Sequence, residues 1–258
     1  MNKWEKYLFL HGEKQIRSML PQTRLMTADH LQELLQKHGS IILKPIDGSG
    51  GRGILLVTSA ENDRSLVQIT LTRQTAANHE LFSVLANEIM RDYIPYLNEI
   101  DIRQLLAASY IIQQRIPLVE AEDRPFDIRV MVQRKNDSPW TVTGKLAKWA
   151  GSGYAITNVN LGAAILPVET VLERSPLRKH SQKALLSHLD EAALLVARRF
   201  QQRFPGIREL GLDMCFDPQG NPWIIEVNFK PHDYLFLALE DQSMYQAIQE
   251  YRGKEGEN

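Results

Sequence analysis

Apolar and polar residues follow either a two-residue or a helical period along most of the chain. Helical spacing predicts helices at 27–39, 79–94 and roughly 177–204, the first beginning near Thr27 or Asp29 and ending at Gly39. Several neighbouring strands are joined by short turns, which favours antiparallel α+β lobes over a doubly wound parallel sheet. The two-residue period and short apolar runs predict strands at 40–46, 54–57, 109–116, 126–134, 140–149, 207–216 and 222–229.

Composition and charge exclude several classes of partner. The 258 residues carry a formal net charge of -1 with no Lys/Arg block, so neither nucleic acid nor a membrane is an expected partner. The single cysteine, Cys215, excludes an internal disulfide framework and is typical of a reducing compartment. The segment MNKWEKYLFLHGEKQ lacks the apolar core of a signal peptide, and no apolar run reaches membrane-spanning length. We therefore expect a cytoplasmic protein.

A glycine-rich segment, DGSGGRG, follows the strand at 40–46. Its glycines match G-x-G-x-x-G, but the next residues, ILLVTS, favour a strand where a dinucleotide-binding motif requires a helix. A P-loop would end in Gly-Lys-Ser/Thr, and this segment ends in Gly51-Arg52-Gly53. The remaining interpretations are a glycine-rich hairpin whose backbone N–H groups contact phosphates, with Lys44 just before it, or a flexible turn.

The C-terminal strand pair carries acidic residues on one face. The turn PQGN predicts a hairpin that places Asp213 across from Glu226, with Asn228 on the same face. Two opposed carboxylates repel each other in an empty site, and a hard cation such as Mg²⁺ relieves that repulsion. The alternative interpretation is the solvated face of an ordinary hairpin.

A second hairpin supplies positive charge. The turn KNDSP, centred on Asp137, predicts that Arg129 lies opposite Lys145, with Asp127 on the same face. Opposed like charges are unfavourable unless an anion lies between them, and a triphosphate would serve, while Asp127 could accept hydrogen bonds from a ribose. The alternatives are ordinary surface lysines and a register that differs by one residue.

Together these segments resemble the ATP-grasp fold, and most closely the YheC/YheD group of spore-coat-associated ATP-grasp proteins. The resemblance covers about 20–231 and rests on LPQTRLMT, SIILKPIDGSGGRGI, YIIQQRIPL, RPFDIRVMVQ, TNVNLGAAI, LGLDMCFD and WIIEVNFKP, in this order. It implies two antiparallel α+β lobes that close over ATP and Mg²⁺. The glycine-rich segment is then similar to the flap that covers the phosphates.

The resemblance also implies roles for individual residues. Lys44 would contact the nucleotide phosphates, and Asp127 would bind ribose. Arg129 and Lys148 would stabilise the transferring phosphate, whereas the hairpin register indicates Lys145, and both lysines stay candidates. The resemblance further implies a flap of Gly48, Ser49, Gly50, Gly51, Arg52 and Gly53, a hinge beside adenine of Gln113, Gln114, Arg115 and Ile116, the metal ligands Asp213, Glu226 and Asn228, and a loop containing Asn158 and Gly162 that approaches phosphate and acceptor.

The implied organisation is an N-terminal helical segment at 1–38, a small lobe at 39–115, a C-terminal lobe with the metal site at 116–250 and a disordered tail at 251–258. ATP-grasp ligases usually carry a separate N-terminal domain, which is missing or reduced here. We therefore expect either a peptide or protein substrate that brings its own surface, or a partner that completes the site.

The implied function is an ATP-dependent carboxylate-amine ligase that acts through an acyl phosphate and releases ADP and phosphate. One alternative is a structural or assembly protein of the spore coat that binds ATP without turnover. Another is phosphotransfer without ligation. The expected location is cytoplasmic or spore-associated.

Overall fold

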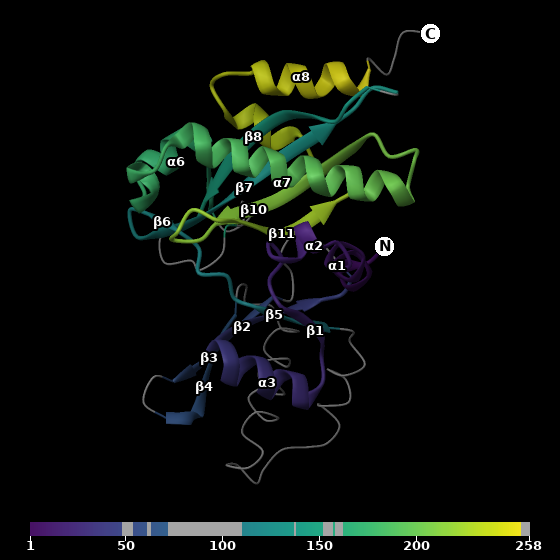
Figure 1. Cartoon of the computed structure of the whole chain (residues 1–258). Coiled ribbons are helices and arrows are strands. Elements are labelled where there is room, and N and C mark those ends of the chain that lie inside the picture. The colour runs from purple at the N-terminus through teal and green to yellow at the C-terminus, as the bar shows by residue number, and fades with distance from the viewer. Residues whose placement is uncertain are drawn as a thin grey trace. The chain divides into compact units, whose positions relative to one another are not determined.

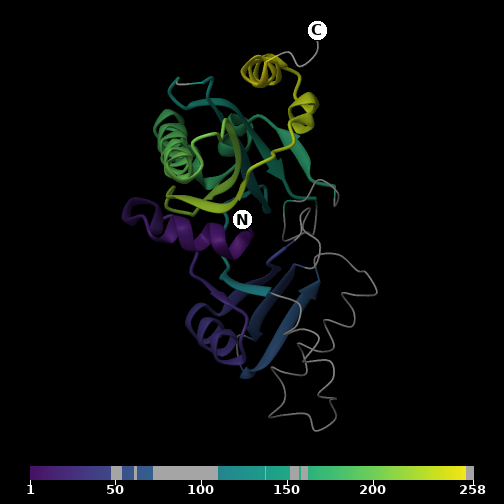
Figure 2. The same ribbon diagram turned by 90° about the vertical axis from the view of Figure 1, so that its right-hand side faces the viewer.

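The computed structural model describes residues 1–47, 54–60, 63–71, 110–136, 138–151, 157 and 162–253 (Figure 1, Figure 2). These residues form two compact units. One consists of Met1–Leu8 with Pro21–Arg115, and the other consists of Phe9–Leu20 with Ile116–Asn258. The assignment of these units to the two lobes stays a prediction. The helix predicted at 79–94 lies outside the described residues.

The first unit is built on a five-stranded antiparallel sheet in the order β1-β5-β2-β3-β4. Strands β2, β3 and β5 confirm those predicted at 40–46, 54–57 and 109–116, whereas β1 and β4 were not predicted. The strands are β1 (Thr23–Leu25), β2 (Ser40–Pro45), β3 (Leu55–Ala60), β4 (Asp63–Leu71) and β5 (Tyr110–Gln114).

Helix α3 (Ala28–His38) packs on this sheet and has both ends specified by sequence. The hydroxyl of Thr27 accepts a hydrogen bond from the backbone N–H of His30, as an N-cap residue does. Gly39 ends the helix with φ of 67°, a left-handed conformation that favours glycine. The predicted helix is therefore confirmed, with Thr27 as its cap. A further helix, α1 (Lys3–His11), precedes it.

The second unit contains a six-stranded antiparallel sheet, in which β11, β10, β7, β8 and β9 follow one another and β6 pairs with β7. This sheet confirms the four strands predicted at 126–134, 140–149, 207–216 and 222–229. The strands are β6 (Glu120–Ala121), β7 (Arg124–Gln133), β8 (Thr141–Trp149), β9 (Ala164–Leu166), β10 (Glu209–Phe216) and β11 (Pro222–Asn228).

The helix predicted at 177–204 is interrupted near its start. A 3-10 turn, η2 (Pro176–Lys179), comes first, His180 is extended, and α7 (Gln182–Arg203) begins after Ser181. The interruption has a local cause, because the Ser181 side chain accepts a hydrogen bond from the N–H of Ala184 and so caps a new helix. The other helices within the described residues are α2 (Lys14–Arg17), α6 (Val168–Glu173), η3 (Tyr234–Ala238) and α8 (Ser243–Arg252).

Helix α8 includes Tyr251 and Arg252, so these two residues do not belong to the predicted tail; residues 254–258 lie outside the described part of the chain. Of the helices that the structure describes, none has the length and apolar composition needed to cross a bilayer.

Helices cover both faces of the second sheet. Helix α7 packs on one face, and α8 with η3 packs on the other, where Phe236 and Ile248 contact Met131 and Leu146 in a buried cluster (Figure 2). Cys215, in β10, is fully buried. The part of the second face that α8 leaves uncovered is where the charged side chains described below lie.

The turn between β10 and β11 is organised by one carboxylate. Asp217 accepts hydrogen bonds from the backbone N–H groups of Gln219 and Asn221, from Nδ2 of Asn221 and from Nε1 of Trp223, at 2.9 to 3.0 Å. Gly220 completes the turn with φ of 82°. Burial alone would raise the pKa of Asp217, but these hydrogen bonds to its ionised form outweigh burial and lower it.

Asp217→Asn is expected to lower the free energy of unfolding by about 2 kcal/mol at pH 6, because hydrogen bonds to an ionised acceptor are stronger than neutral ones. The folded-state pKa of Asp217 is depressed, so its contribution is present above the ordinary Asp pKa of about 3.9 and is lost as the pH falls through the depressed value. Urea unfolding of both proteins at pH 6 and pH 3 should show the difference narrowing at pH 3. A difference that does not depend on pH would contradict this account.

Candidate functional site

Neighbouring strands bring charged side chains to one face of the sheet in the second unit. Asp127 of β7 lies opposite Lys148 of β8, and Arg129 of β7 lies opposite Asp213 of β10. Asp213 also lies opposite Glu226 of β11, which confirms the pairing predicted for the C-terminal hairpin. We call these five residues the charged cluster.

The predicted pairing of Arg129 with Lys145 is wrong. Near the turn, β7 and β8 follow the expected register, but the register shifts between Met131 and Val132. Beyond the shift, Arg129 lies opposite Leu146. A bulge adds one residue to one strand, so every later side chain of that strand meets a different partner and the opposite face.

The bulge separates the two candidate lysines. Lys145 points to the face covered by α7, where its Nζ lies 2.7 and 2.8 Å from the carboxylate oxygens of Asp190. The Nζ of Lys148 lies 2.9 Å from Oδ1 of Asp213 and 2.9 Å from Oδ1 of Asp127. The structure therefore brings Lys148, and not Lys145, to the charged cluster.

Asp213 is the centre of this cluster. Arg129 donates to it in a bidentate manner, from Nε to Oδ1 at 3.0 Å and from a terminal nitrogen to Oδ2 at 3.1 Å. Lys148 donates to Oδ1 at 2.9 Å, and Asn228 donates from Nδ2 to Oδ2 at 3.3 Å. All three charged residues are less than 10% exposed, so water screens their interactions weakly.

Opposite charges within the cluster stabilise one another's ionised forms. Burial alone would raise the pKa of Asp213, but Lys148 and Arg129 outweigh burial and hold it well below its usual range. Burial alone would lower the pKa of Lys148, yet Asp127 and Asp213 raise it. Burial alone would also lower the pKa of Arg129, but the nearby Asp213 outweighs burial and raises it. Asp213 and both cations are therefore ionised at neutral pH.

Asp127 occupies the most buried end of the cluster. Burial raises its pKa, and the nearby Lys148 opposes this effect. The hydroxyl of Thr157 donates a hydrogen bond to Oδ2 of Asp127. Thr157 was not among the predicted site residues, although its position directly before Asn158 in the TNVNLG segment is a signal that could have identified it.

The side chains at this site fit a Mg²⁺ ion by their chemistry. Asp213 and Glu226 supply carboxylate oxygens and Asn228 an amide oxygen, all hard donors of the kind that Mg²⁺ prefers. The Asn228 amide presents its nitrogen to Asp213, so it must turn over to offer its oxygen. Within the described residues, no group of three or more His, Cys, Asp or Glu side chains could hold a metal, so the amide is needed to complete a set of three ligands. The metal role stays a prediction.

The C-terminal helix fixes the loop that follows Asn228. Arg252 of α8 donates to the carbonyl oxygen of Pro231 at 3.0 Å, and another of its nitrogens lies 2.5 Å from Oδ2 of Asp233. The same guanidinium lies 2.8 Å from the carboxylate of Glu209 at the start of β10. Arg252 was predicted to belong to a disordered tail, and no motif in the sequence indicates this contact.

Gly211→Ala is expected to displace this loop. A Cβ at position 211 would meet the Cβ of Pro231 at less than 3.0 Å and would lie 3.5 Å from Cδ of Arg129. Because neither the proline ring nor the backbone of β10 can turn aside, the loop must move, at a cost of about 1–3 kcal/mol measured by urea unfolding. Gly206→Ala is the matched control, since nothing lies within 4 Å of a Cβ there. Equal destabilisation by both substitutions would contradict the prediction.

In the first unit, Lys44 belongs to a buried polar chain. It donates from Nζ to Oε1 of Gln113 at 2.5 Å, and Gln113 donates from Nε2 to the hydroxyl of Thr23 at 3.1 Å. Lys44 is 7% exposed. The structure thus brings together two of the residues predicted to border the nucleotide.

The predicted hinge, Gln113 to Ile116, has some of its backbone groups already engaged. The N–H of Gln114 donates to the carbonyl of Gln22 at 2.8 Å, and the N–H of Arg115 donates to the carbonyl of Ser40 at 3.3 Å. The predicted contact with adenine would therefore fall to other backbone groups of the segment.

Two predicted parts of the site lie outside the described residues. These are the glycine-rich flap, Gly48 to Gly53, and Asn158. Gly162, which the sequence pattern groups with Asn158, is described and has φ of 79°.

Comparison with known proteins identifies the family. The model of the YheC/D-like ATP-grasp family matches residues 1–252. The chain belongs to this ATP-grasp family. The endospore coat-associated protein YheC of Bacillus subtilis (strain 168) is 25% identical over 249 residues, which cover 94% of this chain. YheD of the same strain is 24% identical over 238 residues, which cover 91% of it.

This ATP-grasp chain is shorter than those relatives: the matched part spans 64% of YheC and 49% of YheD. Among solved structures, D-cycloserine synthetase DcsG has a TM-score of 0.53 and 13% identity, and the match covers 95% of this chain and 68% of that one. At this identity the likeness shows the fold alone. The family and the α+β ATP-grasp fold predicted from sequence are confirmed.

Proposed function

We propose that this ATP-grasp protein is a ligase that uses ATP and Mg²⁺ to join a carboxylate to an amine through an acyl phosphate. The observation that carries the proposal is the arrangement of Arg129, Asp213 and Lys148, in which one buried carboxylate holds two buried cations beside Glu226. Burying such a set of charges gains little stability over apolar packing, so folding alone gives weak reason for it.

Arg129 and Lys148 are proposed to bind the phosphoryl group that is transferred. In the described structure both cations donate hydrogen bonds to Asp213. A γ-phosphate offers the same cations more negative charge, so we expect them to exchange Asp213 for the nucleotide and to stabilise the charge on the transferred group. Asp127 would keep Lys148 oriented, and its contact with ribose stays a prediction.

Asp213, Glu226 and Asn228 are the residues that would hold Mg²⁺, together with phosphate oxygens. When bound, the cation neutralises charge on the phosphates of ATP. Asp213 becomes available for this role when the two cations turn to the nucleotide. Lys44 and the glycine-rich segment are also proposed to contact phosphates of ATP.

The proposed chemistry has two steps. A carboxylate oxygen of the substrate forms a bond to the γ-phosphorus of ATP, the bond from that phosphorus to the β,γ-bridging oxygen breaks, and ADP leaves. The amine nitrogen then forms a bond to the acyl carbon, phosphate departs with the former carboxylate oxygen, and the amine loses a proton. Arg129 and Lys148 bind the phosphoryl group throughout, and the chemistry uses no side-chain nucleophile.

The proposed substrate is a peptide or a protein. A second candidate function, ATP binding without turnover in assembly of the spore coat, is favoured by the names of the relatives YheC and YheD. A spore-associated location belongs to the same proposal.

Mass spectrometry of peptides encoded by neighbouring genes tests the two functions. The peptides are co-expressed with the wild-type protein and, as a control, with the Glu226→Gln variant. A ligase adds to one peptide the mass of an amine less one water, and the variant does not. ATP binding with no ADP release and no mass change in any peptide would overturn the ligase and support the assembly function.

A further inference from the structure

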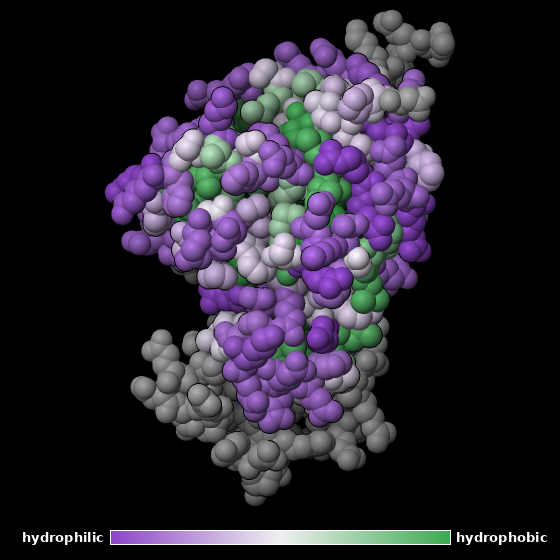
Figure 3. Space-filling model, viewed as in Figure 1, coloured by the Kyte–Doolittle hydropathy of each residue, from purple (hydrophilic) through white to green (hydrophobic). Residues whose placement is uncertain are grey.

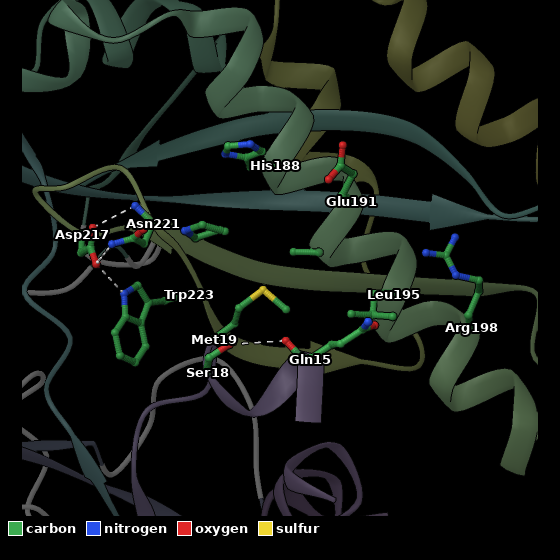
Figure 4. A pocket seen from close by; sticks show the side chains of 12 residues that line it. Gln15, Ser18, Met19, His188, Glu191, Leu195, Arg198, Asp217, Asn221 and Trp223 are labelled. Atoms are coloured by element: carbon green, nitrogen blue, oxygen red, sulfur yellow. Dashed lines mark hydrogen bonds between the residues drawn. The ribbon is translucent and has the colours of Figure 1, made fainter. Parts of the chain in front are cut away.

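A pocket of about 610 Å³ lies in the second unit away from the charged cluster, between α2, α7 and the turn that joins β10 to β11 (Figure 4). Its volume is within the range of about 300–1,000 Å³ found for sites of small ligands. The proposed ligase chemistry uses none of its residues. Figure 3 shows apolar and polar residues interleaved over the surface that carries α7, so the pocket does not belong to one continuous apolar patch.

The apolar wall of the pocket is held in place by hydrogen bonds. The indole N–H of Trp223 donates to Oδ2 of Asp217 at 3.0 Å, so the ring can offer only its apolar surface to a ligand. The carbonyl oxygen of Met19 accepts a hydrogen bond from the N–H of Ile224 at 2.8 Å, which fixes the chain beside β11. Figure 4 shows the Met19 side chain between Trp223 and α7. A ligand would therefore find this wall already formed.

Two opposite charges stand on the helical side of the pocket. Glu191 and Arg198 both line it, and both project from α7. They are seven residues apart, which places them on one face of the helix and about 10 Å apart along its axis, too far to pair with each other. Arg198 has no ion pair or hydrogen bond within the described structure, and Glu191 accepts one from the hydroxyl of Ser187.

We propose that this pocket binds a short zwitterionic peptide of three or four residues. An extended tripeptide spans about 10 Å, which matches the separation of the two charges. Its ammonium group would lie at Glu191 and its carboxylate at Arg198, where a guanidinium can bind both carboxylate oxygens. An apolar side chain in the middle of the peptide would contact Met19, Leu195 and Trp223.

The pocket shares a strand with the charged cluster. Trp223 and Glu226 both belong to β11, three residues and about 10 Å apart. A bound peptide would therefore contact the same strand that carries a proposed metal ligand. Binding at this pocket does not depend on the proposed ligase activity, and it can be measured without ATP.

Isothermal titration calorimetry with the tripeptide Ala-Leu-Ala tests the proposal on the full chain. Saturable binding with a dissociation constant of about 1 mM or tighter is expected for the wild type. Arg198→Gln should weaken binding at least tenfold, and so should Glu191→Gln. Both residues are exposed, so neither substitution threatens the fold. The C-terminally amidated peptide should bind wild type and Arg198→Gln equally, and the N-acetylated peptide should do the same for Glu191→Gln.

Lys183→Gln is the matched control, because Lys183 is an exposed cation of the same helix that does not line the pocket. Its affinity for the peptide should equal that of the wild type. The absence of saturable binding to the wild type would overturn the proposal. So would an equal loss of affinity in Arg198→Gln and Lys183→Gln, which would indicate general attraction to a basic surface.

Discussion

Asp213→Asn is expected to reduce ATP turnover at least about 100-fold and to lower the free energy of unfolding by about 3 kcal/mol. The first effect follows from the loss of a carboxylate that the proposed metal site needs. The second follows because Arg129 and Lys148 are buried and share this carboxylate, so neutralising it leaves two cations with too little negative charge beside them. The hairpin pattern alone predicts the opposite for stability, namely relief of repulsion between Asp213 and Glu226.

Glu226→Gln separates the two effects. Glu226 lies at the same proposed metal site but is only partly buried, whereas Asp213 is buried and forms the ion pairs with Arg129 and Lys148. We expect a comparable loss of turnover with a smaller loss of unfolding free energy than in Asp213→Asn, because partial exposure to water screens the charge of Glu226. Turnover is measured as ADP release with Mg²⁺, and stability by urea unfolding. Normal turnover in both variants would exclude the metal role of this hairpin.

Lys148→Met is expected to abolish most of the stabilisation that ATP and Mg²⁺ confer. At a hundredfold excess over the dissociation constant, ligand stabilises the wild type by about 2.7 kcal/mol, and a hundredfold weaker affinity reduces this gain to about 0.4 kcal/mol. Without ligand, Lys148→Met should also lose about 3 kcal/mol, because Asp127 and Asp213 remain buried with one cation fewer. Thermal and urea unfolding with and without ATP-Mg²⁺ measures both quantities.

Lys145→Met is the control for this experiment. Lys145 contacts Asp190 on the other face of the sheet and is partly exposed, so its loss should cost less than about 1 kcal/mol and leave the gain from the nucleotide intact. Arg129→Met should resemble Lys148→Met. An equal gain from ATP-Mg²⁺ in all four proteins would mean that the charged cluster does not contact the nucleotide.

Register shifts decided which pairings of the site could be predicted from sequence. Next to the turn, β10 and β11 pair one residue away from the predicted register, for example Met214 with Ile224, and the irregularity between Asp213 and Met214 restores the predicted pairing of Asp213 with Glu226. The predicted pairing of Arg129 failed because β8 contains one extra residue between Val142 and Gly144, and the alternation of residue types in the sequence does not reveal it. The family resemblance named Lys148, which the structure brings to the charged cluster, because a resemblance rests on residue positions and does not require a register; the role of Lys148 toward phosphate stays a prediction.

Features of the fold that depend on neighbouring residues could be predicted from sequence, whereas features that depend on distant residues could not. Thr27 and Gly39 set the ends of α3 through contacts within one helical turn, so the sequence is sufficient there. Strand β4 forms the edge of its sheet, and its mixture of polar and apolar residues gives a weak strand pattern. Arg252 contacts Glu209, Pro231 and Asp233 only after the chain has folded, and no local pattern could have revealed it.

Because Cys215 is buried, its reaction with an alkylating reagent can report local opening of the sheet. The thiol lies in β10, between Asp213 and the turn, and is inaccessible in the closed sheet. An alkylating reagent can react with it only when this region opens, so the alkylation rate measures the free energy of opening at one known position. Because the chain has no other cysteine, each modified molecule records an opening of this hairpin alone. The rate can be followed while ATP-Mg²⁺ or a peptide is added.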